Sequence, residues 1–189
     1  MRKLILLLLF IPLVSFGQIE NLFALEYDKE FALYYGKHFL MTEVLGEPNS
    51  DYSKFELDPL TASNSREITT IYYKSGEKNL EGLVFGFFDE YWNRQGIGFK
   101  GYAFKALNKD EATQLIDKIE NIIDSERKFL NADDNVNNIY FSFKDMTVLV
   151  YRAGPLAGRI RIFWNGFDAE WENSKFNKTK RRFIKATKK

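Results

Sequence analysis

The segment from Asn108 to Leu130 constrains the fold more than any other part of the sequence. Its apolar residues recur at steps of three and four, which places them on one face of an α-helix with charged and amide residues on the other. Asn108 is followed three residues later by Glu111, a variant of the capping box, and Asp110 with Glu111 suits the positive end of the helix dipole. We therefore expect one amphipathic helix that lies on a flat apolar partner through Ala112, Leu115, Ile116, Ile119, Ile122, Ile123 and Phe129.

Strand-like segments on both sides of this helix supply such a partner. They are rich in aromatic and β-branched residues, and short turns separate them, which favours antiparallel hairpins. In the last of them Ile160, Ile162 and Trp164 alternate with Arg159, Arg161 and Phe163, the pattern of a sheet with one wet face. The predicted strands are Glu67–Lys74, Leu80–Asp89, Ile97–Leu107, Ile139–Phe143, Thr147–Arg152 and Gly158–Trp164.

The fold class that follows is α+β. We expect an antiparallel or mixed sheet of about six strands in the order β-β-β-α-β-β-β, covered on one face by the Asn108–Leu130 helix and by short helices between Ile19 and Leu45. Asn49–Arg66 is polar and contains a proline, so it predicts a loop. Phe167–Phe176 predicts a short helix.

One short element has a counterpart in a known family. Leu45-Gly46-Glu47-Pro48 ends a helical segment, since Gly46 can take a left-handed conformation and Pro48 forbids continuation. A helix with this ending, followed by a strand, resembles a local element of the BamE and β-lactamase-inhibitor-protein group of small envelope proteins. The resemblance covers about ten residues and implies, at most, an envelope interaction domain.

The N-terminus has the pattern of an export signal. Arg2 and Lys3 precede an apolar run from Leu4 to Val14, and Ser15-Phe16-Gly17 offers small residues at the spacing a signal peptidase requires. The run is too short to span a bilayer, which needs about 20 apolar residues. The sequence thus predicts a signal peptide over 1–17, a single α+β domain over 18–174 and a basic tail over 175–189, with no transmembrane span in the mature chain and a periplasmic or extracellular location.

Composition narrows the class further. Hydrophobic residues make up 45% of the 189-residue chain and aromatic residues 16%, which argues against disorder. The tail holds eight Lys and Arg and no acid, and without these and the two N-terminal cations 17 basic residues face 26 acidic ones. The tail could be a solvated end, could fold back on the acidic body, or could contact an anionic partner. Nucleic acid is not expected, because the body would repel phosphate.

The usual catalytic and metal-binding patterns are missing from the sequence. There is no cysteine and one histidine, His38, so neither thiolate catalysis nor a zinc site is expected. Asp133, Asn135 and Asn137 alternate as in a calcium loop, but Lys144 stands where the bidentate Glu should be. The glycines of 96–101 match a dinucleotide fingerprint, yet a strand follows them instead of a helix. We therefore predict no cofactor and no metal.

The excess of aromatic residues is the remaining indication of function. Tyr91, Trp92 and Arg94 fall in a predicted hairpin loop, and Trp164 and Trp171 flank the end of the last predicted strand. Exposed Trp and Tyr give large rigid contact areas; alternatively, these rings close the open end of the core.

These observations favour a non-enzymatic exported binding module that acts through these aromatics or through the open face of the sheet. Its partner would be an envelope protein, a glycan or a small apolar ligand. Two alternatives stay open. One is a glycan hydrolase using paired carboxylates, with Asp89 and Glu90 as candidates. The other is a carrier of a small apolar ligand, held in a cavity under a bent sheet.

Overall fold

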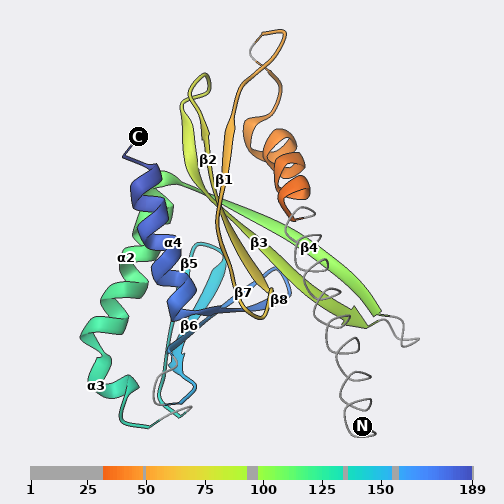
Figure 1. Ribbon diagram of the computed structural model, residues 1–189. Coiled ribbons are helices and arrows are strands. Elements are labelled where there is room, and N and C mark those ends of the chain that lie inside the picture. The colour runs from red at the N-terminus through yellow and green to blue at the C-terminus, as the bar shows by residue number, and fades with distance from the viewer. Residues whose placement is uncertain (1–31, 49, 93–97, 134–135, 155–157, 189) are drawn as a thin grey trace, which may run out of the picture.

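The computed structural model describes residues 32–48, 50–92, 98–133, 136–154 and 158–188, and for residues 90–92 and 98–100 it describes the backbone alone. Within these ranges the chain is an α+β fold with two antiparallel sheets of four strands each. Each sheet is a meander of consecutive strands followed by a helix, so the chain runs through the same arrangement twice (Figure 1). The predicted fold class is confirmed, but the single six-stranded sheet is wrong.

Sheet A has the strand order β1-β2-β3-β4. The β3–β4 hairpin is its longest part and pairs without interruption from Gly82 opposite Asn108 to Trp92 opposite Gly98. The strands are β1 (Glu56–Ala62), β2 (Ile68–Ser75), β3 (Leu80–Trp92) and β4 (Gly98–Asn108).

Sheet B has the order β5-β6-β7-β8. As the sequence predicts, Ile160 and Ile162 of β7 are buried on one face of the sheet, while Arg159, Arg161 and Phe163 lie on the other. The strands are β5 (Asn138–Phe143), β6 (Met146–Arg152), β7 (Gly158–Trp164) and β8 (Phe167–Glu172).

Two strands were not predicted, and each has an identifiable physical reason. β1 lies in the polar segment predicted as a loop; it tolerates Pro59 because it is an edge strand whose register shifts between Pro59 and Thr61. β8 lies in the segment predicted as a short helix. Asn165 and Gly166 before it have φ of 49° and 81°, the positive values of a tight hairpin turn, so the chain reverses there and pairs with β7.

The central helix begins as predicted and ends earlier. The Asn108 side chain accepts a hydrogen bond from the Glu111 N–H at 2.9 Å, and the Glu111 side chain accepts one from the Asn108 N–H at 3.1 Å, which confirms the capping box. The helix α2 (Lys109–Ser125) stops at Ser125, and a separate turn, α3 (Arg127–Leu130), follows. The buried residues of α2 are Ala112, Leu115, Ile116 and Ile119, whereas Phe129 of α3 is exposed.

Most of the predicted basic tail is helical. The helix α4 (Asn173–Ala186) buries Phe176, Thr179, Phe183 and Ala186 at helical spacing. Lys180 forms an ion pair with Glu120 of α2, which places the two helices side by side (Figure 1). Of the three interpretations of this segment, the structure shows it folded back on the body.

Sheet A lies between two hydrophobic clusters, one on each of its faces. Leu83, Phe85 and Phe87 of β3 point into a large cluster shared with α2, α4 and the inner face of sheet B. Val84 points the opposite way, into a second cluster that contains Leu40 from the helical segment 32–45, whose last part is the π-helix η1 (Leu40–Leu45). Sheet A is therefore covered on both faces, and the prediction that all helices cover one face is wrong.

In the described part of the chain, no helix combines the length and the apolar character that crossing a membrane requires.

Candidate functional site

The aromatic residues predicted to bind a partner lie in three different environments. Tyr91 and Trp92 end strand β3, paired with Phe99 and Gly98, and are not in a loop. Their side chains, and Arg94 as a whole, lie outside the described residues. The proposal of an aromatic contact surface at this hairpin therefore stays a prediction.

The two remaining tryptophans point toward the core of the molecule. Trp171 is fully buried, with its ring 5.4 Å from Phe85 and 5.2 Å from Phe176 between centroids. Trp164 is half-buried; its ring lies 5.1 Å from that of Phe87, and its Nε1 donates to Asp145 at 2.8 Å. Both rings thus close the space between the sheets, and neither belongs to the open face of sheet B.

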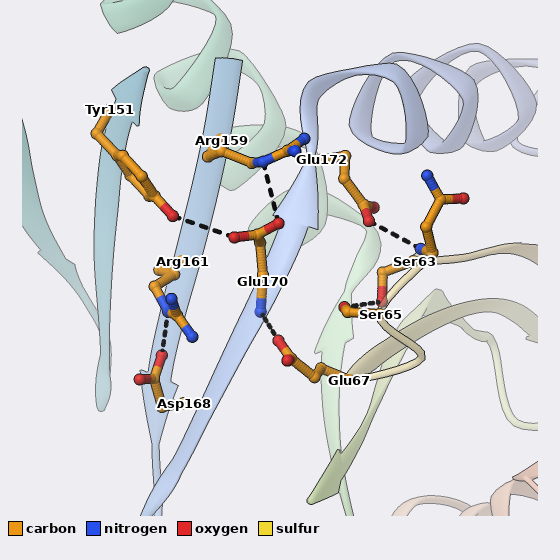
Figure 2. Close-up of polar contacts among 10 residues, drawn as sticks. Ser63, Ser65, Glu67, Tyr151, Arg159, Arg161, Asp168, Glu170 and Glu172 are labelled. Carbon is orange, nitrogen blue, oxygen red and sulfur yellow. Dashed lines mark hydrogen bonds and ion pairs between the residues drawn. The ribbon is translucent and has the colours of Figure 1, made fainter. Parts of the chain in front are cut away.

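The open face of sheet B carries charged and aromatic side chains instead. Part of this face is open to solvent, since Tyr140 is 75% and Phe163 38% exposed. Cross-strand ion pairs order its charges. Arg161 Nε lies 2.6 Å from Asp168 Oδ1, and Arg159 Nε lies 3.0 Å from Glu170 Oε1 (Figure 2).

Glu170 is the centre of this network. Its second carboxylate oxygen accepts a hydrogen bond from the Tyr151 hydroxyl at 3.1 Å, so one carboxylate fixes both Tyr151 and Arg159 (Figure 2). Burial, and then the negative charge of Glu170, raises the pKa of Tyr151 above its usual value. The same carboxylate thus favours the protonated tyrosine, which donates the hydrogen bond.

The loop between β1 and β2 ties sheet A to the edge of this network. Glu67 accepts a hydrogen bond from the backbone N–H of Glu170 at 2.6 Å, and Glu172 accepts one from the N–H of Asn64 at 2.8 Å (Figure 2). Both bonds join residues more than 100 positions apart in the sequence. They hold β8, and with it Glu170, in a fixed position.

A pocket of about 500 Å³ opens where the network meets the end of sheet B. It lies between the C-terminal part of α2 with α3 on one side and the ends of β6 and β7 on the other. Among the described residues that line it there is no Asp or Glu, but there are three arginines. We call it the arginine pocket; it is lined by Ile123, Arg127, Leu130, Asn131, Val150, Tyr151, Arg152, Gly158, Arg159, Ile160 and Asn173.

Each guanidinium of the pocket is held by a neighbour. Nε of Arg159 forms an ion pair with Glu170, and Nη2 of Arg127 lies 3.3 Å from Oδ1 of Asp124. Arg152 donates to the Asn131 side chain and, at 3.4 Å, to the carbonyl of Gly154. A guanidinium has five N–H donors in a rigid fork, so one that is anchored on one side can still present donors to an oxyanion.

Four of the residues that line the pocket are apolar, and we call them its floor: Ile123, Leu130, Val150 and Ile160. Ile123 is half-buried, and the other three are buried. Apolar walls lower the local dielectric and strengthen the attraction between an arginine and an anion. A cationic rim of three arginines over an apolar floor suits binding of a ligand with an anionic group beside an apolar part.

The candidates for acid catalysis are not brought together with this pocket. Asp89 lies on β3 opposite Gly101, and only the backbone of Glu90 is described. A separate pocket of about 420 Å³ is lined by Glu56 and Asp58, with Tyr72 and Lys74. Among the described residues, no three His, Cys, Asp or Glu side chains gather so that they could hold a metal ion.

Sequence reasoning missed the arginine pocket. The sequence places Arg159 on the wet face of a strand, and no motif links it to Arg127 or Arg152. Comparison of the chain with protein-family models, with curated proteins and with solved structures finds no match.

Proposed function

We propose that the chain is an exported binding module, not an enzyme, and that the arginine pocket binds a small ligand with a carboxylate or phosphate group next to an apolar part. The observation that carries the proposal is the presence of three arginines over an apolar floor, with no acidic lining residue among those described. The sequence suggests a small apolar ligand as one possible partner, and the pocket adds an anionic group to that ligand.

The anchoring of Arg152 and Arg159 supports binding rather than catalysis. The carboxylate of Glu170 accepts a hydrogen bond from Tyr151 and forms an ion pair with Arg159. It could carry a proton to or from a substrate only by breaking these contacts. Pre-organised donors cost little side-chain entropy when a ligand binds, which favours affinity for an oxyanion.

Calorimetric titration of the purified protein tests the ligand class. We expect octanoate or octyl phosphate to bind and octanol not to bind, because octanol has the apolar part without the charge. The stronger of the two acids identifies the preferred head group. Equal binding of octanol, or no binding of either acid, would contradict the proposal.

Substitutions test the site. Arg152→Gln and Arg159→Gln should each weaken binding about 10- to 100-fold, since each removes charge-assisted hydrogen bonds. Arg181→Gln on the exposed side of α4 is the matched control and should leave the affinity unchanged. If neither pocket variant changes the affinity, the ligand binds outside the arginine pocket.

Export is tested separately by mass spectrometry of the protein recovered from a bacterial host. The proposal expects a chain that begins near Gln18 in the periplasm or medium. An intact Met1 on protein confined to the cytoplasm would refute export without touching the pocket.

A further inference from the structure

Three of the four sheet edges carry features that prevent pairing with another chain. Glu67 accepts a hydrogen bond from the edge N–H of Glu170 on β8. On β1, Pro59 and the register shift before Thr61 interrupt the edge. β4 carries lysines, including Lys105. Proline, bulges, lysines and covering loops are the known means by which natural sheets avoid edge-to-edge association.

The fourth edge, β5, has none of these features in the part of the chain that the structure describes. Its sequence from Asn138 to Phe143 contains no charge, no proline and no glycine. Among the described residues, no hydrogen bond other than those with β6 reaches the backbone of residues 139–143. A row of unpaired N–H and C=O groups along such an edge is a template for another strand.

The two faces of β5 are also incompletely covered. Tyr140 on the open face is 75% exposed. Ile139, Phe141 and Phe143 on the inner face are only half-buried, whereas Met146, Val148 and Val150 beside them on β6 are buried. The core of sheet B therefore ends with apolar surface still open to solvent at this edge.

We propose that β5 pairs antiparallel with β5 of a second copy of this chain, which joins two copies of sheet B into one sheet of eight strands. A two-fold axis through Tyr140 places Tyr140 opposite its counterpart, Asn138 opposite Ser142 and Ile139 opposite Phe141. Opposed residues then point to the same face, so aromatic, polar and apolar side chains each meet their own kind. No charges meet, and eight strands is an ordinary sheet size. This interface goes beyond the proposed ligand binding and does not depend on it.

Sedimentation velocity of the purified full protein over a wide concentration range tests the interface. The wild type should show a monomer–dimer equilibrium. The double variant Asn138→Lys/Ser142→Lys places like charges opposite each other twice and should raise the dimer dissociation constant about tenfold or more. The double variant Asn138→Lys/Ser142→Glu places opposite charges there and should keep the dimer.

Thr147→Lys is the matched control, because Thr147 lies beside Ser142 on the same exposed face but within the sheet. It should leave the dimer intact, and thermal unfolding should show all variants folded. A wild type that is monomeric at every concentration would overturn the proposal. A dimer that both double variants leave unchanged would also overturn it. So would a monomeric wild type that co-purifies with a different protein, if the Asn138→Lys/Ser142→Lys variant no longer binds that protein.

Discussion

Sheets A and B have the same topology but differ in how they are covered. Sheet A packs the segment 32–45 on one face and shares the main core on the other, so Val84 and Phe85, neighbours on β3, are both fully buried. Sheet B shares that core with its inner face alone. The comparison shows that one four-stranded meander can be buried on both faces, while the other keeps a polar face that is ordered by ion pairs.

The two halves are also joined crosswise. α4 follows sheet B in the sequence, yet it contacts β1 and β2 of sheet A as well as β7 and β8. α2 follows sheet A and contacts β6 as well as β3 and β4. Because each helix covers both sheets, we expect the described chain to unfold as one cooperative unit.

The largest expected effect tests the difference between the two faces of sheet B. Trp171→Ala removes a fully buried ring from the inner face and should lower the free energy of unfolding by about 3–5 kcal/mol. Phe163→Ala, on the open face, should cost less than about 1 kcal/mol. Urea denaturation measures both. If both variants lose a similar amount of unfolding free energy, the two faces of sheet B do not differ as described.

The second effect tests the cover on the outer face of sheet A. Leu40→Ala should cost about 2–4 kcal/mol, because Leu40 is fully buried against Ile71, Tyr73 and Val84. Met41→Ala, at the neighbouring exposed position, is the control. If Leu40→Ala unfolds with the stability of the control, segment 32–45 is not part of the core.

A smaller effect tests the crosswise attachment of α4. Thr179 is buried, and its hydroxyl lies 2.7 Å from that of Thr61 and 2.9 Å from that of Thr70. Thr179→Val keeps the shape of the side chain but removes both hydrogen bonds, so we expect the free energy of unfolding to fall by about 1–2 kcal/mol. Thr113→Val, at an exposed position on α2, should be nearly neutral. Equal unfolding midpoints for the two would show that the threonine cluster does not fix α4.

The smallest effect concerns pH. The ammonium group of Lys105, then the indole N–H of Trp164, lowers the pKa of Asp145, which joins sheet B to sheet A. A lowered folded pKa means that Asp145 stabilises the protein above its unfolded pKa of about 3.9 and that this contribution is lost as pH falls through the folded pKa. Since Asp145 is exposed, Asp145→Asn should cost only about 0.5 kcal/mol at pH 7, and the difference should vanish in acid. If the stability difference between wild type and Asp145→Asn grows as the pH falls, the predicted direction of the effect is wrong.

The sequence was sufficient for features determined by local chemistry. The capping box at Asn108 and the alternation along β7 depend on residues close together in the chain, and both are confirmed. Asn165-Gly166 between two alternating segments is an equally local hairpin signal; it was overlooked because the aromatic residues after it were grouped with the helix that begins at Asn173.

Features determined by tertiary packing could not be predicted in this way. Pro59 argues against a strand unless the strand is known to lie at an edge. Arg127, Arg152 and Arg159 meet only because α2–α3 packs over the ends of β6 and β7. No single segment carries that information, so the arginine pocket required the structure.

The most direct test of the central claim, that the ligand-binding side of the molecule is the sheet B half, is an NMR titration of the isotope-labelled protein with octyl phosphate and octanoate. We predict that the amide and guanidinium signals of Arg152 and Arg159 shift, together with signals of Leu130 and Ile160, while those of β2 stay in place. Shifts confined to sheet A, or no shifts with either compound, would contradict the account.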